Sequence, residues 1–216
     1  MDKYSVVILY FCIYKKFCYI GIEQNVILVK QQFNNLPDIV ERLAHFGCEQ
    51  TYRELFDLLF LPAKKFAFCI LHSNEEAEEV AEDVMITLWK QRKTLLEINN
   101  VHVYALVIAK NLSLNVLKKN SRNKTTSLDD TDINFYFDSS SPEQIILDNE
   151  LKIRLQNAIQ SLPPKCQLVF KLAKENDLSY KQIAEILSIS VKTVDAQLVA
   201  ATQKLAKIFK SEFQIK

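Results

Sequence analysis

The chain contains 216 residues and carries a formal net charge of +1, a length that suits one domain or two small ones. Only two residues are glycine, which excludes a glycine-rich phosphate loop and is too few for the tight turns of a strand-rich fold. Hydrophobic residues make up 49% of the chain, so a packed core can form, and the composition predicts an all-α protein.

Residues 1–32 match no element of a helical domain. The run Ser5–Tyr14 is strongly apolar, but a membrane span needs about 20 apolar residues, and Lys15 interrupts the run. A signal peptide is not indicated either, because a lysine pair follows the apolar run without a small-residue cleavage site. We interpret residues 1–32 as an N-terminal extension, we expect about the first 20 to 25 of them to be dispensable for function, and we expect no stable membrane insertion.

Residues 33–122 form the first predicted helical domain. Apolar residues recur with helical spacing from Tyr52 to Leu71, and Pro62 predicts a break or bend within this segment. A capping box of Ser73 and Glu76 then indicates the start of the next helix.

The helix that follows this capping box is predicted to be amphipathic and acidic. It is expected to end near Trp89. Its apolar side chains recur at three- and four-residue steps as one buried stripe. The stripe consists of Ala77, Val80, Ala81, Val84 and Leu88. The acidic residues between Glu75 and Asp83 lie largely on the other face, which is typical either of a solvated surface or of a surface for a partner.

A further helix is predicted from Val101 to Lys119. Its expected core stripe is Tyr104, Ile108, Leu112 and Leu117, and the polar residues around it are Lys110, Asn111, Asn115 and Lys118. Every charged residue from Val101 to Ser127 is basic, which suits a polyanionic partner. We expect His72 and His102 at the surface or at helix caps rather than as metal ligands.

Residues 123–145 are predicted to be a flexible polar linker. They are rich in Ser, Thr, Asp and Asn, contain Pro142, and show no sustained hydrophobic period. The chain is therefore predicted to fold as two small helical domains, of which the second spans residues 146–216.

The second domain carries the pattern of a helix-turn-helix. One helix begins at Pro163–Pro164 and buries Leu168, Val169 and Leu172. A capping box of Ser179 and Gln182 starts a short helix, Ser188–Ile189 forms a tight turn whose isoleucine fills the angle between helices, and Ser190 caps a longer helix that reaches about Phe209. The predicted inward residues of that last helix are Val194, Leu198, Ala201 and Leu205.

The outward residues of the last helix are candidates for base reading in the major groove of DNA. They are Lys192, Thr193, Asp195, Ala196 and Gln197. Lysine can contact phosphate or guanine, and glutamine can bind adenine through two hydrogen bonds. The alternative is a plain helical hairpin in an interaction domain.

Catalytic and metal chemistry are not indicated. The five cysteines lack CxxC spacing, and the three histidines form no ligand pair. We expect no cofactor, no metal site, no small-molecule substrate and no enzymatic activity, and the free thiols suit a reducing, cytoplasmic location.

Segments of both predicted domains resemble segments of one known protein family. Leu162–Lys165, Val169–Phe170 and the run LSYKQIAEILSISVKTV resemble region four of bacterial sigma factors, in particular the extracytoplasmic-function (ECF) class of the sigma-70 family. Glu75–Trp89 resembles the region-two helix that docks on the polymerase clamp, and Tyr104–Asn115 resembles the promoter-facing helix of the same region.

The resemblance implies a transcription initiation factor that binds core RNA polymerase, promoter DNA and an anti-sigma factor. It implies that region two binds polymerase and the minus-ten element, and that region four binds the minus-thirty-five element. The implied polymerase-binding residues are Glu78, Glu79, Glu82, Asp83 and Trp89. The implied DNA-binding residues are the five outward residues of the last helix together with Lys110, Asn111, Asn115 and Lys118.

Some residues depart from the family pattern. Ser188 stands where the family usually has glycine, which predicts a strained backbone at the turn. Glu82 and Met85 replace a glutamine and a phenylalanine, and Asp195 adds a negative charge to a helix that is often basic. Asp195 can accept a hydrogen bond from cytosine or form a salt bridge with a neighbouring lysine.

Two other classes of function stay open from the residues alone. A response-regulator-type transcription regulator shares a similar helix-turn-helix, but it requires an α/β receiver domain where residues 33–122 are predicted to be helical. A helical interaction protein, associated with membranes through Ser5–Tyr14, is the other alternative.

Overall fold

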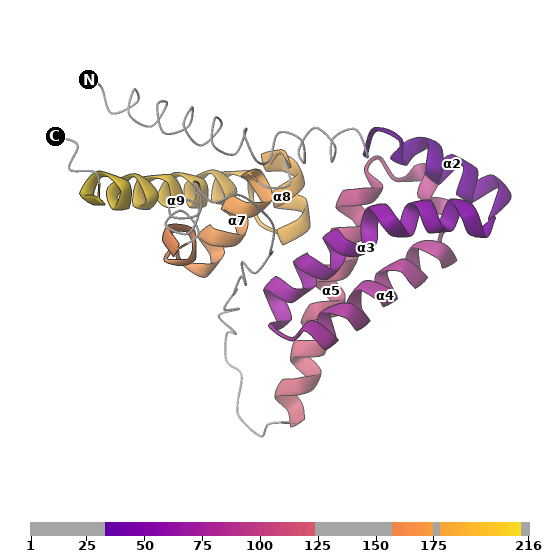
Figure 1. Cartoon of the computed structure of the whole chain (residues 1–216), viewed down its shortest axis with the longest axis horizontal. Helices are drawn as coiled ribbons and strands as arrows, with labels where there is room; N and C mark the ends of the chain where they lie inside the picture. Colours follow the sequence, from indigo (N-terminus) through magenta and orange to yellow (C-terminus); the bar gives the residue numbers. More distant parts are fainter. Residues whose placement is uncertain (1–32, 124–156, 175–177, 213–216) are drawn as a thin grey trace, which may run out of the picture. The chain divides into compact units, whose positions relative to one another are not determined.

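The structure, a computed structural model, describes residues 33–123, 157–174 and 178–212, and every regular element in these ranges is a helix (Figure 1). The elements are α2 (Leu36–Phe46), α3 (Glu49–Leu71), α4 (Asn74–Lys90), the 3₁₀ helix η1 (Thr94–Glu97), α5 (Val101–Asn123), α7 (Pro164–Lys174), α8 (Tyr180–Leu187) and α9 (Val191–Glu212). They form two units: α2 to α5 belong to one, and α7, the Tyr180–Ala184 part of α8 and α9 belong to the other. The predicted all-α fold with two helical domains is confirmed.

α3 is the central helix of the N-terminal unit, where it packs against α2, α4 and α5 (Figure 1). Leu55 and Leu59 on α3 and Val84 and Leu88 on α4 have no solvent exposure. Full burial of such a side chain stabilises the fold by about 1.5–3 kcal/mol. The buried stripe predicted for α4 is confirmed in full, since Ala77, Val80, Ala81, Val84 and Leu88 are all buried.

Pro62 does not interrupt α3, so of the predicted break or bend the break is wrong, and the bend stays a prediction. The helix continues from Glu49 to Leu71 through the proline. A proline inside a helix removes one backbone hydrogen bond and costs about 3 kcal/mol. Leu59 and Ala63 beside Pro62 are fully buried, so apolar packing on both sides offsets that cost.

The buried face of α5 differs from the predicted stripe. The helix extends beyond the expected end at Lys119, and small residues on it, Ala105, Ala109 and Ser113, are buried. The residues predicted for the core, Tyr104, Ile108, Leu112 and Leu117, are only half-buried. Val101, Val103 and Leu106 are buried as well, so the contact face of α5 is displaced around the helix from the predicted stripe.

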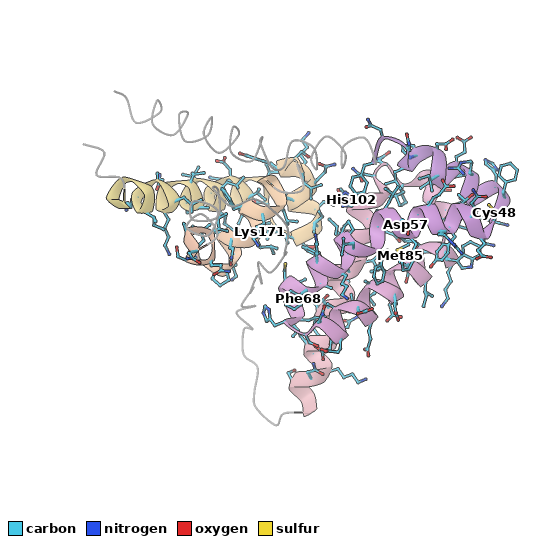
Figure 2. All side chains as sticks on the ribbon, viewed as in Figure 1. Cys48, Asp57, Phe68, Met85, His102 and Lys171 are labelled. Atoms are coloured by element: carbon cyan, nitrogen blue, oxygen red, sulfur yellow. The ribbon has the colours of Figure 1, made fainter. Side chains whose placement is uncertain are left out.

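His102 lies in the interior rather than at the surface (Figure 2). Its ring stacks on Phe33, with 4.3 Å between ring centroids, and its Nε2 is buried without a hydrogen-bond partner among the described residues. Burial lowers the pKa of His102 to about 4, so the neutral ring is the folded form at neutral pH. His72 fits the prediction, since it is exposed and ends α3 with a φ of 60°.

The C-terminal unit follows the predicted order of helices. α7 begins at Pro164 and buries Leu168, Val169 and Leu172, and α9 packs against it. All four predicted inward residues of α9, Val194, Leu198, Ala201 and Leu205, are buried. Ile189 in the turn is half-buried, and its place in the angle between the helices stays a prediction. Ile183 of α8 is fully buried.

The described helices do not support the alternative of a response-regulator-type transcription regulator. Residues 33–123 contain no strand, so an α/β receiver cannot occupy this part of the chain. None of the described helices is long and apolar enough to cross a membrane. Residues 1–32 and almost all of the predicted linker 123–145 lie outside the described residues.

Candidate nucleic-acid and partner interfaces

The turn between α8 and α9 is fixed by side-chain caps at both helix starts. The Ser179 backbone N–H donates to Gln182 Oε1 at 2.8 Å, and the Gln182 N–H donates to Ser179 Oγ at 3.4 Å. The Thr193 N–H donates to Ser190 Oγ at 3.0 Å. Both caps predicted from the sequence are confirmed, and each is worth about 1 kcal/mol to its helix. The start of α9 is therefore held in a defined geometry.

Ser188 adopts the backbone conformation that its place in the turn requires. Its φ is 56°, the left-handed region in which a side chain is disfavoured. Its N–H donates to Glu185 O at 3.2 Å, and the Ile189 N–H donates to Ala184 O at 3.0 Å. The strain predicted from the serine-for-glycine difference is confirmed.

The first turns of α9 present the predicted base-reading residues to solvent, with one exception. Lys192, Thr193, Asp195 and Ala196 are exposed, whereas Gln197 is half-buried at the edge of the packed face. The Thr193 hydroxyl also lies 2.7 Å from Ser190 Oγ, so the capping interaction occupies it in part. Asp195 has no salt bridge to any described residue, so its carboxylate is available to a partner.

Sequence reasoning missed Val199 and Ala200 on the same helix. Both are exposed, and Val199 exposes 46% of its surface. They lie three and four residues after Ala196, which places all three side chains on one face. The pattern could have shown this, because it follows from the inward positions that were predicted correctly.

α4 carries the acidic surface expected from the sequence. Glu79, Glu82 and Asp83 are exposed, and none of them has a salt bridge within the described residues. Glu78 differs, because its Oε2 lies 2.7 Å from Lys64 Nζ on α3. Ile86 lies on the acidic face and is 45% exposed, a feature that the charge pattern did not reveal. The surface therefore combines carboxylates with one apolar side chain.

The start of α4 is capped as predicted, but only in part. The Glu76 N–H donates to Ser73 Oγ at 3.2 Å, as in a capping box. The Glu76 carboxylate does not complete the box, because Oε1 accepts from Asn120 Nδ2 at 2.8 Å. Glu76 thereby joins α4 to the end of α5.

Trp89 belongs to an aromatic cluster between α3 and α4. It meets Tyr52 edge-to-face with 5.1 Å between ring centroids, and the Arg92 guanidinium lies 4.6 Å from the ring centre. Phe56 continues the cluster along α3 and stacks on Phe60 at 4.5 Å. Trp89 is half-buried, so one part of the ring stabilises the unit and another part stays accessible.

On α5 three of the four predicted polar residues share one outward face, and Lys110 lies to the side of it. Asn111, Asn115 and Lys118 are exposed, and Lys110 is half-buried. Helical spacing places the half-buried Tyr104 on the same side, where its hydroxyl donates to Gln91 Oε1 at 2.7 Å. This face combines amides, cations and an aromatic ring, the groups that bind phosphates and bases.

The described residues offer no metal centre. No group of three or more His, Cys, Asp or Glu side chains with metal-ligand geometry occurs among them. Cys48, Cys69 and Cys166 form no disulfide among the described residues, and of these three only Cys69 is buried.

Two family models match the chain, one on each unit. The model described as Sigma-70 region 2 matches residues 55–123, which include α4 and α5. The model described as Sigma-70, region 4 matches residues 152–205, which include α7, α8 and the first part of α9.

Curated proteins with similar sequences carry related names. The chain is 23% identical over 141 residues to the ECF RNA polymerase sigma factor SigE of Mycolicibacterium smegmatis, a match that covers 65% of this chain and 54% of the relative. It is 25% identical over 166 residues to the RNA polymerase sigma-H factor of Pseudomonas aeruginosa, covering 72% and 86%. It is 26% identical over 161 residues to the ECF RNA polymerase sigma factor RpoE of Cereibacter sphaeroides, covering 73% and 85%. The match thus spans about half of the first relative and most of the other two.

Solved structures share the fold at low sequence identity. CnrH in complex with the cytosolic domain of CnrY superposes with a TM-score of 0.53 at 14% identity, covering 81% of this chain and 97% of CnrH. The sigma factor RpoE in complex with the anti-sigma factor NepR from Bartonella quintana also gives 0.53, at 15% identity, covering 74% and 96%.

Proposed function

Because this chain belongs to the sigma-70 family of RNA polymerase sigma factors, in its ECF class, we infer that it directs core RNA polymerase to specific promoters at the start of transcription. Region 2 binds core polymerase and the minus-ten element, and region 4 binds the minus-thirty-five element. The observation that carries this conclusion is the occurrence of both regions, in family order, on the two helical units. We further propose domain boundaries at 33–122 and 146–216, with 123–145 as the linker.

We propose the acidic face of α4 as the surface that binds core polymerase. Glu79, Glu82 and Asp83 supply exposed negative charge, and the exposed Ile86 supplies an apolar contact among them. Glu78 and Trp89 belong to the same surface, although Lys64 partly neutralises Glu78 and Trp89 is half-buried. Burying one apolar side chain inside a ring of charges gives both affinity and specificity.

The outward face of α5 is proposed to contact the minus-ten element. Lys110 and Lys118 can neutralise phosphates, and the amides of Asn111 and Asn115 can bond to base edges or to the backbone. Asn111, Asn115 and Lys118 are exposed on one face, which supports this assignment.

The first two turns of α9 are proposed to enter the major groove at the minus-thirty-five element. Lys192 and Asp195 are exposed there, and so are Thr193 and Ala196. Gln197 can read adenine if its half-buried side chain turns outward. The fixed caps at Ser179 and Ser190 support this proposal, because base reading needs a rigid frame.

Regulation by an anti-sigma factor is part of the proposal. Two solved structures that share the fold are complexes of this kind, CnrH with CnrY and RpoE with NepR. We propose further that the chain acts in the cytoplasm and has no catalytic activity of its own, since the polymerase performs the chemistry.

Reconstituted transcription tests the proposed function. Core polymerase and the full chain are mixed, and transcripts are mapped from a library of promoter fragments. Initiation at defined sites that requires the chain is the expected result. Failure of the chain to bind core polymerase in a direct titration would instead favour a helical interaction protein.

A further inference from the structure

The outward face of α9 carries an apolar strip formed by Ala196, Val199 and Ala200. All three residues are exposed, and Val199 exposes 46% of its surface. Their spacing of three and four residues aligns them along the helix, opposite the buried Val194, Leu198 and Ala201. The strip begins one turn after Lys192, so it follows the charged first turn directly.

The strip does not serve the stability of the unit. A valine at an exposed helix position lowers helix propensity, because its branched side chain loses rotamer freedom in the helix. The inward face of α9 already packs against α7. A surface helix is typically polar on its outer face, and here apolar residues stand at the centre of that face instead.

The major groove offers one specific apolar feature, the C5-methyl group of thymine. Alanine, threonine and other apolar side chains contact this methyl group, whereas guanine is most often read by arginine or lysine. Neither α8 nor α9 contains an arginine, and the first two turns of α9 contain one lysine, Lys192. Next to this one guanine-reading side chain, the helix offers three apolar contacts.

We propose that the apolar strip reads thymine methyl groups in the upstream promoter element, and that Val199 is a specificity-determining residue for A·T base pairs. This inference rests on the proposed function. Ala196 and Ala200 are four residues apart, about 6 Å along the helix axis, which corresponds to roughly two base-pair steps of 3.4 Å. The strip can therefore contact thymines at neighbouring base pairs, with Lys192 on a flanking phosphate.

The first step of the test is a selection. Core polymerase reconstituted with the full chain selects its preferred upstream elements from a library randomised in that region. We expect selected elements with thymines at two or more adjacent or near-adjacent positions. Selected elements without thymine at any fixed position would overturn the inference while leaving the proposed function intact.

The second step removes only the methyl group. Each selected thymine is replaced by deoxyuridine, which keeps every hydrogen-bonding group of the base. Loss of one buried methyl contact should weaken holoenzyme binding by about fourfold, since one buried CH₂ is worth ~0.8 kcal/mol. With Val199→Ala the effect of at least one deoxyuridine should disappear, because the variant lacks the contacting methyls.

Leu61→Ala is the control. Leu61 is also an exposed apolar residue, at 52%, but it lies on α3 and outside every proposed DNA contact, so its variant should keep the full response to deoxyuridine. An unchanged affinity of the wild-type holoenzyme for deoxyuridine elements would overturn the inference. So would an equal loss of the response in both variants. Absence of any promoter-specific initiation would overturn the proposed function itself, and the inference with it.

Discussion

At the scale of single residues, the turn serine is the clearest case of local strain. Ser188 holds a φ of 56°, where a residue with a Cβ is destabilised by roughly 1–2 kcal/mol relative to its normal conformations. Ser188→Gly relieves this strain, but glycine also raises the conformational entropy of the unfolded chain. We therefore expect a net stabilisation of about 0.5–1 kcal/mol. Amide hydrogen exchange in α8 and α9 measures the effect as slower exchange. Ser188→Ala keeps the Cβ and should give no gain, and equal protection in both variants would argue against backbone strain.

His102 gives the N-terminal unit a defined acid sensitivity. Its pKa is lowered from 6.5 to about 4 by burial, so the folded state binds its proton less readily than the unfolded state does. The stability due to the neutral ring is complete above pH 6.5 and is lost as the pH falls toward 4, by up to about 3 kcal/mol. Urea unfolding followed by fluorescence of Trp89, the single tryptophan, measures this loss between pH 7 and pH 4.5.

The control for this effect uses an exposed histidine. His102→Phe should flatten the pH dependence of stability, because a phenylalanine fits the stack on Phe33 and has no proton to bind. His45→Gln, at an exposed position, should leave the pH dependence in place. A wild-type stability that did not change between pH 7 and pH 4.5 would contradict the burial of a neutral His102.

At the scale of elements, α4 separates its structural face from its proposed docking face. Reversing the charges in Glu79→Lys with Asp83→Lys should weaken core-polymerase binding by tenfold or more, because both carboxylates are exposed and unpaired among the described residues. Helical content by circular dichroism should stay the same. A fluorescence titration with core polymerase measures the affinity. Glu49→Lys, on the exposed start of α3, is the control and should bind as wild type does.

The salt dependence of DNA binding should test the role of the basic face of α5. Lys118→Ala removes one proposed phosphate contact, so the slope of log affinity against log salt should fall by roughly one unit for duplex promoter DNA. Asn115→Ala should change promoter preference or opening instead, with little change in slope. Parallel titrations of holoenzyme on one promoter between low and moderate salt compare the two variants. An unchanged slope in Lys118→Ala would remove this lysine from the interface.

The buried faces of the helices show which features the sequence predicts and which it does not. The stripes of α4 and α9 were predicted correctly, because large aliphatic residues at helical spacing point to one buried face. The face of α5 was assigned wrongly, since apolar residues occur on more than one side of this helix, and the buried ones include Val103 and Leu106 rather than Ile108 and Leu112. Pro62 did not break α3 because this helix packs against α4 and α5, and the local sequence does not show these long-range contacts. The stacking of His102 on Phe33 likewise joins residues far apart in sequence.

At the scale of the whole molecule, the two units are proposed to have separate functions, core binding and recognition of the upstream element. A substitution that unfolds one unit should therefore leave the function of the other intact. Val194 has no solvent exposure, and Val194→Asp places an unpaired charge in the core of the C-terminal unit. Such a charge costs several kcal/mol, comparable to the total stability of a small domain. We expect the variant to lose protection in α7 to α9 and to lose dependence on the upstream element. Core binding through the N-terminal unit should persist.

Leu59→Asp is the corresponding variant in the N-terminal unit. Leu59 is equally buried, but it lies in the N-terminal unit, so its replacement should abolish core binding and shift the fluorescence of Trp89. Hydrogen exchange of α7 and α9 should remain as in the wild type, because Leu168, Val169 and Val194 in their core are untouched. Comparing both variants in the core titration and in hydrogen exchange gives a crossed pattern if the units fold separately. Loss of protection in both units from either substitution would show that they fold as one cooperative body, and the assignment of separate tasks to separate units would have to be abandoned.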